Sequence, residues 1–412
     1  MLNRKLYIFT GNTRASAYGI GTYVMQLVEC LKGTDIDFGV VEVYTKGDEV
    51  TVTEKDGYQY ISIPSVTFSG RESSKYYARN IAYLLKEYIK EEKGVEYIFQ
   101  LNFMGDAVLA GSLKKMFKCK IILVAHYTRW GFSLSGDYSR LKQILAKKTS
   151  QRNNTEKTVA AGVREDAQMI AKCDKLVCVA RHSLQSFLEL YHLDKSKVLL
   201  VNNALKDSYI PMSEGEKQII RFQYHFSADE SILLFVGRLD AAKGLSYLIQ
   251  AFRVVLKTRP TTRLVIAGEG DFNYWLKEAK DIWAQITFTG RIDKETLYRL
   301  YNIADAGVVC SIHEEFGLVA IEMMMHQLPV IVTDSGGLSE IVEDGVSGLK
   351  VSLIKEEDTL KVDVDKLASK IELLLEQPVY AKAIGVNGRV RFLENYELSK
   401  FKHEMLALYN MI

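Results

Sequence analysis

The sequence predicts an α/β protein with parallel sheets, organised as two domains of the Rossmann type. Short apolar runs rich in β-branched residues alternate with segments of helical period along nearly the whole chain. This alternation is typical of parallel sheets covered by helices on both faces. The same pattern restarts in the second half, and the 412 residues are enough for two domains at roughly 100–200 residues each.

The first half contains a series of predicted strands, at residues 6–9, 38–44, 97–101, 121–125, 176–179 and 198–201. Between the first two strands, apolar residues at helical spacing predict an amphipathic helix: Ile20, Tyr23, Val24, Leu27, Val28 and Leu31. Polar residues dominate 142–157, where we expect an exposed helix or loop.

The second half contains predicted strands at residues 232–236, 264–267, 286–288, 307–310 and 329–333. Its first helix carries one apolar face, made of Leu245, Leu248, Ile249, Phe252 and Leu256. Residues from about 202 to 230 show no clear strand period, so the interdomain connection is expected there. The predicted domains are 1–205 and 206–395, followed by a terminal helix over 396–412.

Composition excludes several classes of function. The 53 Lys and Arg residues nearly balance 51 Asp and Glu, and the formal net charge of +2 gives no field that would attract nucleic acid. The five cysteines are scattered and form no C-x-x-C pair, which argues against disulfides and zinc. Without a signal peptide or an apolar stretch of spanning length, a cytoplasmic protein is expected, and local basic patches leave room for peripheral membrane contact.

Ligands of open parallel sheets bind beyond the carboxyl ends of the strands, where helix N-termini favour anions. The strand 232–236 leads into Gly237-Arg238-Leu239-Asp240-Ala241-Ala242-Lys243-Gly244. Arg238 can fork across two phosphate oxygens and Lys243 supplies a point charge, a combination that suits a pyrophosphate. A turn with two solvated cations is the competing interpretation.

A second cluster follows the strand 307–310 and runs from Ser311 to Glu322. The start of a helix near Phe316-Gly317-Leu318 would offer backbone N–H groups to a phosphate, with no side chain at Gly317 to block it. Glu314 and Glu322 could be a helix cap and an exposed helix residue, or a hydrolase acid and base pair. They could also accept hydrogen bonds from sugar or ribose hydroxyls, and a nucleotide sugar would use both the anion site and the acceptors.

Other strand ends carry weaker signals. Asp334-Ser335-Gly336-Gly337 follows the strand 329–333, Gly19-x-Gly21 precedes the first helix, and His126 follows the strand 121–125. A dinucleotide fingerprint is disfavoured because Val24 occupies its third glycine position. The D-x-D sequences at 35–37 and 363–365 lie in polar stretches, so no metal site is predicted.

Taken together, these segments resemble glycosyltransferase family 4, whose members have the GT-B fold of two facing Rossmann-like domains. The residues that carry the resemblance are Gly237-Arg238, Lys243-Gly244, Gly268-Glu269-Gly270, Thr289-Gly290, Glu314-x7-Glu322 with Phe316-Gly317 between, Pro329 to Val332, Gly336-Gly337-x-x-Glu340 and Gly345-x-x-Gly348. The match is specific over 231–352 and looser over the N-terminal half.

The resemblance implies a retaining transfer of a hexose from a UDP-, GDP- or ADP-sugar to an unidentified acceptor, with no cofactor or metal. Its catalytic residues would be Glu314, His126, Arg238 and Lys243. Its donor-binding residues would be Gly19, Gly21, Gly237, Gly268, Ile292, Phe316, Gly317, Leu318, Val319 and Glu322.

By that likeness the two cations neutralise the diphosphate, Glu314 contacts sugar hydroxyls, Glu322 accepts from the ribose, and Ile292 lies near the base. His126 and the Gly19–Gly21 segment approach from the acceptor-side domain. A sugar phosphorylase or epimerase of the same architecture, or an inactive nucleotide-sugar-binding module, remains the alternative.

Overall fold

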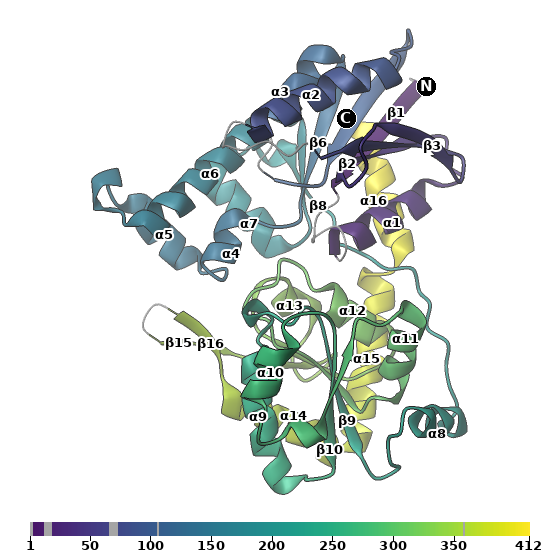
Figure 1. The fold of residues 1–412 in the computed structure, drawn as a ribbon, viewed down its shortest axis with the longest axis vertical. Helices are drawn as coiled ribbons and strands as arrows, with labels where there is room; N and C mark the ends of the chain where they lie inside the picture. The colour runs from purple at the N-terminus through teal and green to yellow at the C-terminus, as the bar shows by residue number, and fades with distance from the viewer. Residues whose placement is uncertain (1–2, 12–18, 66–72, 105–106, 357–358) are drawn as a thin grey trace. The chain divides into compact units, whose positions relative to one another are not determined.

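The computed structural model describes residues 3–11, 19–65, 73–104, 107–356 and 359–412. The chain divides into two compact units. The first comprises residues 1–134, 138–204 and 398–412, and the second comprises 135–137 and 205–397. Figure 1 shows the elements of both units along the chain.

The first unit is built on a sheet with strand order β3-β4-β2-β1-β5-β6-β7-β8. The strands are β1 (Asn3–Gly11), β2 (Asp37–Thr45), β3 (Thr51–Lys55), β4 (Tyr58–Pro64), β5 (Val95–Leu101), β6 (Cys119–Ala125), β7 (Lys175–Cys178) and β8 (Val198–Leu200). All pairs are parallel except β3 with β4. The predicted strands are confirmed, and the hairpin of β3 and β4 was missed although its Asp56-Gly57 turn, with φ of 47° and 82°, is a typical hairpin signal.

Helices cover both faces of this sheet. They are α1 (Gly19–Leu31), α2 (Ser73–Tyr88), α3 (Ala107–Met116), α4 (Arg129–Ser133), α5 (Tyr138–Ala146), α6 (Asn154–Lys172), α7 (Arg181–Tyr191) and, from the end of the chain, α16 (Leu398–Met411). The apolar stripe of α1 is buried as its period predicts. Helix α16 packs beside α1, where the ring centroids of Tyr23 and Phe401 lie 5.4 Å apart.

The second unit has an all-parallel sheet with strand order β11-β10-β9-β12-β13-β14. The strands are β9 (Ser231–Val236), β10 (Thr262–Ala267), β11 (Ile286–Gly290), β12 (Ala306–Val309), β13 (Val330–Thr333) and β14 (Leu349–Val351). The apolar face of α9 (Leu245–Thr258) packs onto these strands together with α10 (Phe272–Glu278) and α14 (Val364–Glu376). Figure 1 shows α11 (Lys294–Ile303) and α12 (Leu318–Met325) on the other side of the strands.

Several elements of the second unit were not predicted from the sequence. The stretch expected to hold the interdomain connection contains α8 (Glu214–Gln223), whose start is marked by a capping box between Ser213 and Glu216. Strand β14 and the hairpin of β15 (Leu353–Glu356) and β16 (Thr359–Val362) were also missed. The remaining helices are α13 (Gly336–Ile341) and α15 (Pro378–Asn395). Over the described ranges, none of the helices combines the length and apolar character needed to cross a membrane.

Candidate functional site

The strand order of the second unit places the loops of the predicted motifs next to one another. Strands β10, β9, β12 and β13 are consecutive in the sheet and parallel, so their carboxyl ends meet at one edge. Backbone hydrogen bonds join the loops that follow them. Leu239 N donates to Glu269 O over 2.8 Å, Ile312 N to Ala242 O over 3.0 Å, and Gly337 N to Glu314 O over 2.9 Å.

Lys243 and Glu314 meet at this edge although they lie 71 residues apart. The Lys243 ammonium donates to Glu314 Oε1, and the Ser311 hydroxyl donates to the same oxygen over 3.1 Å. Both side chains are largely buried, with exposures of 22% and 20%. Burial raises the pKa of Glu314, but Lys243 and Ser311 lower it by more, so the carboxyl pKa lies below its ordinary value. Glu314 is therefore held as a carboxylate beside a cation.

Arg238 belongs to the same loop and is held by Asp240. The guanidinium lies 3.2 Å from Asp240 Oδ2. The other oxygen of Asp240 accepts from the backbone N–H of Lys243 over 3.2 Å and caps the 3-10 turn 241–243. One carboxylate thus pairs with the Arg238 guanidinium and caps the turn that carries Lys243. Sequence reasoning missed this role of Asp240, although an Asp three residues before Lys243 has the spacing of a capping residue.

Glu322 is placed differently from Glu314. Helix α12 begins at Leu318 with Gly317 as its N-cap residue, and Glu322 lies in its second turn. Its Oε2 accepts from the Tyr301 hydroxyl of α11 over 2.9 Å. Burial raises the pKa of Glu322, and the Tyr301 hydroxyl opposes that rise. The two glutamates therefore do not share partners, and Tyr301 was not found from the sequence.

The glycines of the motifs allow the loops to approach one another closely. A Cβ on Gly268, whose φ is 154°, would lie 1.8 Å from Gly237 O. A Cβ on Gly317 would lie 2.6 Å from Leu338 Cδ2. The sequence interpretation of Gly317 was clearance for a phosphate; the structure adds a packing reason, because α13 occupies the space beside it.

Gly337→Ala is expected to lower the free energy of unfolding by about 2 kcal/mol, since overpacking of this kind typically costs 1–3 kcal/mol. The new Cβ would lie 2.2 Å from Phe316 O, so the loop that carries Glu314 has to move. Urea unfolding of the full chain measures the loss. The matched control is Gly57→Ala in the turn between β3 and β4, where a new Cβ would have no atom within 4 Å. Because φ is 82° there, this substitution introduces backbone strain without a steric clash. Equal stability of Gly337→Ala and the wild type would contradict the close approach.

The remaining predicted residues of the second unit lie near these loops. Ile292 follows β11 and is half-buried, and the carbonyl of Gly290 just before it accepts from Gly268 N over 3.0 Å. Phe316 is buried, and its ring centroid lies 5.8 Å from that of Tyr396. The backbone of 316–319 therefore leads from the Glu314 loop directly into α12.

His126 lies against the helix that Gly19 and Gly21 begin, within the first unit. Gly19 and Gly21 form the first turn of α1, while residues 12–18 before them lie outside the described residues. Tyr23 of the same helix packs edge-on against the His126 ring, with centroids 4.5 Å apart. His126 Nε2 lies 3.2 Å from Asn102 Oδ1, and Asn102 itself is fully buried at the end of β5.

A polar network supports this histidine and was not predicted. Gln100 Nε2 donates to Asn102 Oδ1 over 3.4 Å, and the Tyr409 hydroxyl of α16 donates to Gln100 Oε1 over 2.5 Å. Buried polar side chains of this kind need partners. The signal available in the sequence was the pair Gln100 and Asn102, which follows directly on the apolar run 97–99.

The architecture and the site together define a class of protein. Two Rossmann-like units, one with cations and carboxylates gathered at the carboxyl edge of its sheet, are the features of a GT-B protein. Solved structures agree with this fold. Sucrose-phosphate synthase from Thermosynechococcus elongatus superposes with a TM-score of 0.77 at 22% identity, covering 99% of this chain and 98% of that one. HepE of Anabaena in complex with UDP-glucose gives a TM-score of 0.71 at 14% identity over 99% and 100%.

Residues 216–391 match the family model Glycosyl transferases group 1, so the second unit carries a domain of this kind. An uncharacterized glycosyltransferase from Methanocaldococcus jannaschii is 33% identical over 200 residues, which is 47% of this chain and 51% of the relative. The α-D-kanosaminyltransferase of Streptomyces kanamyceticus is 25% identical over 253 residues, 61% and 62% of the two chains. The chain thus matches between about half and two thirds of the length of these curated relatives.

Proposed function

We propose that this protein is a retaining glycosyltransferase that moves a hexose from a nucleoside-diphosphate sugar to an acceptor hydroxyl. The observation that carries the proposal is the meeting of Lys243 and Glu314 at the carboxyl edge of the second sheet. It places a cation for the diphosphate beside a carboxylate for sugar hydroxyls, within a domain that matches the group 1 glycosyl transferases.

Arg238 and Lys243 would stabilise the departing diphosphate. Charge develops on the phosphate oxygen as the bond to the sugar C1 breaks, and preorganised cations in a largely buried site lower the energy of that state. Asp240 fixes the guanidinium and the turn before Lys243, so little reorganisation is needed. These two side chains supply the positive charge that a metal ion supplies in other transferases, which supports a metal-independent reaction.

The proposed transfer needs no nucleophile from the protein. The acceptor oxygen forms the new bond to C1 on the face from which the diphosphate leaves, and the acceptor proton passes to the departing phosphate oxygen. Glu314 would hold the sugar hydroxyls and Glu322 the ribose hydroxyls. HepE, a structural neighbour, was solved with UDP-glucose, which supports a nucleotide sugar as the donor here.

The experiment is titration calorimetry of the full chain with UDP, GDP and ADP and with one hexose conjugate of each. We expect one nucleotide to bind in the micromolar range. Incubation with its hexose conjugate should then release the nucleoside diphosphate slowly with water and faster with a sugar or polyol acceptor. Binding of none of the three, or a reaction that requires inorganic phosphate, would contradict the proposal, as would conversion to an epimer.

A further inference from the structure

The Tyr301 side chain of α11 forms a hydrogen bond with Glu322 of α12. Its hydroxyl donates to Glu322 Oε2 over 2.9 Å, and its side chain is 1% exposed. The other oxygen, Oε1, accepts no hydrogen bond from the residues that the structure describes. One oxygen of Glu322 is thus occupied by the protein, and the second is left for another donor.

The ring of Tyr301 is itself held by His326. His326 lies four residues after Glu322, so the two side chains share one face of the helix that ends there. The backbone N–H of His326 donates to Glu322 O over 3.2 Å, and its ring centroid lies 5.3 Å from that of Tyr301. The imidazole is 4% exposed, and burial lowers its pKa to about 4. The His326 ring is therefore neutral near pH 7 and packs against Tyr301 as an uncharged aromatic ring.

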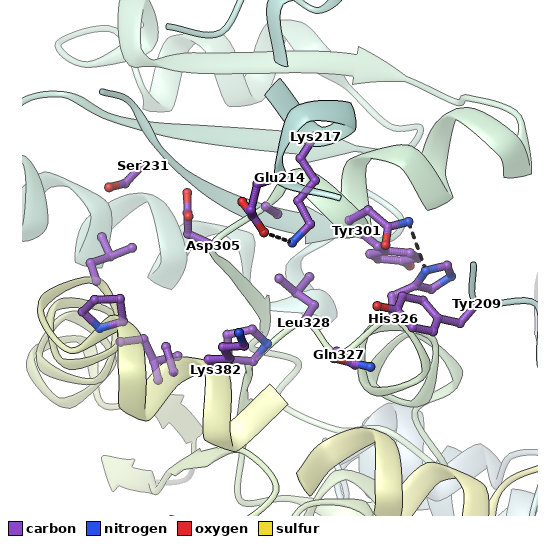
Figure 2. Close-up of a pocket in the computed structure, with 17 residues that line it drawn as sticks. Tyr209, Glu214, Lys217, Ser231, Tyr301, Asp305, His326, Gln327, Leu328 and Lys382 are labelled. Carbon is purple, nitrogen blue, oxygen red and sulfur yellow. Dashed lines mark hydrogen bonds and ion pairs between the residues drawn. The ribbon is translucent and has the colours of Figure 1, made fainter. Parts of the chain in front are cut away.

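This support extends to the segment at the start of the second unit. The rings of Tyr209 and His326 lie 5.7 Å apart, and the Arg389 guanidinium of α15 lies 4.5 Å from the centroid of Tyr209. Arg389 also donates to both oxygens of Asp207, over 3.1 and 2.8 Å. In Figure 2, Tyr301, His326 and Tyr209 gather at one side of a cavity of about 280 Å³, away from Glu214 and Lys217. Because the cavity borders Tyr301, the contact with the His326 ring, whose plane is tilted by 32°, contributes to fixing the tyrosine ring.

From this arrangement we infer that Tyr301 is a positioning residue for donor binding: it orients Glu322 so that Oε1 is presented to the ribose of the nucleotide. The inference rests on the proposed function. Without the Tyr301 hydroxyl, the half-buried carboxylate loses the one hydrogen bond that it accepts from the described residues and is free to rotate. A carboxylate that has lost its orientation binds ribose less well, and it leaves the contacts of the base and the phosphates unchanged.

The test is Tyr301→Phe, with Tyr298→Phe as the matched control. Tyr298 lies one turn earlier on α11, and its ring also packs on His326, with centroids 4.5 Å apart. Within the described part of the chain its hydroxyl makes no hydrogen bond, to Glu322 or to another residue. Both variants remove one hydroxyl and keep the ring, so folding is tested equally by each.

The probes are the nucleoside diphosphate that binds the wild type and its 2′-deoxy and 3′-deoxy analogues, measured by calorimetry. We expect the wild type and Tyr298→Phe to prefer the ribonucleotide by about tenfold, consistent with a hydrogen bond to a charged group. Tyr301→Phe should bind the ribonucleotide about tenfold more weakly and the deoxy analogues equally well, so that the preference falls below about twofold. The KM for the nucleotide sugar should rise with kcat changed less than threefold.

The outcomes separate this inference from the function on which it rests. An unchanged ribose preference in Tyr301→Phe overturns the positioning role, even when transfer activity is intact. Equal losses for ribo and deoxy ligands also overturn it, because they indicate a general structural defect. A wild-type chain that binds none of UDP, GDP and ADP overturns the proposed function, and the inference with it.

Discussion

Lys243→Ala is expected to lower the rate of sugar transfer by on the order of 10²–10³-fold, because removing one preorganised donor to a developing anion has effects of this size. The affinity for the nucleoside diphosphate should fall as well, since Lys243 is proposed to contact the diphosphate. The substitution also leaves Glu314 buried without its cation. Breaking a buried ion pair from one side costs about 3 kcal/mol of unfolding free energy. Steady-state kinetics and urea unfolding measure the two effects.

A double variant separates catalysis from stability. Lys243→Ala with Glu314→Gln removes both charges, so most of the lost stability should return while transfer stays impaired. Lys217→Ala is the control for loss of a lysine, because its pair with Glu214 is on the surface, one turn apart on α8, and such pairs contribute at most about 1 kcal/mol. Recovery of transfer in the double variant would refute a role of Lys243 at the diphosphate.

Glu314→Gln is expected to lower kcat by about 10²-fold while binding of the nucleoside diphosphate stays within about threefold of the wild type. The amide keeps the size of the side chain and an oxygen for the Ser311 hydroxyl, but it loses the charge that is proposed to hold the sugar. Lys243 keeps its charge for the diphosphate. The sugar conjugate should therefore lose the affinity that it has over the bare nucleotide, and calorimetry with both ligands measures that loss.

Glu230→Gln is the matched control for this change. Glu230 pairs with Arg263 over 2.8 Å with exposures of 15% and 27%, close to the values of the Lys243 and Glu314 pair. Arg263 lies near the start of β10, and Ser231, the residue after Glu230, begins β9. The Glu230 and Arg263 pair is therefore at the amino edge of the sheet, whereas Lys243 and Glu314 are at the carboxyl edge. We expect Glu230→Gln to lose about as much unfolding free energy as Glu314→Gln and to keep the wild-type rate of sugar transfer. Loss of transfer in both variants would mean that Glu314 acts only through folding.

The predicted strands were recovered because parallel buried strands leave a strong local signal. Runs such as 232–236 and 264–267 are apolar without interruption, and each is followed by a glycine turn. Elements without that signal were missed. Strand β3 is exposed along its whole length, β14 has three residues, and α8 lies in a polar stretch where only its capping box marks the start.

The candidate site was predictable as a set of residues but not as a set of contacts. Glycine turns, cations and carboxylates after successive strands indicate an anion and sugar site, since strand ends of a parallel sheet share one edge. That Lys243 pairs with Glu314 and Arg238 with Asp240 follows from side-chain distances that the order of residues does not contain. The partner of Glu322 is 21 positions away on a different helix, and no spacing rule connects them.

The sequence by itself determined the fold class and the set of residues that we propose to bind a nucleotide sugar, because apolar period and turn chemistry are local properties of the chain. The tertiary structure decided which charges neutralise each other, which glycines are required by a neighbouring backbone, and that Tyr301 rather than a cation holds Glu322. These properties depend on the strand order β10-β9-β12-β13 and on α11 packing beside α12. The physical reason is that hydrogen bonds and ion pairs act over a few ångströms in space, whereas Tyr301 and Glu322 are 21 positions apart in the sequence and Lys243 and Glu314 are 71 positions apart.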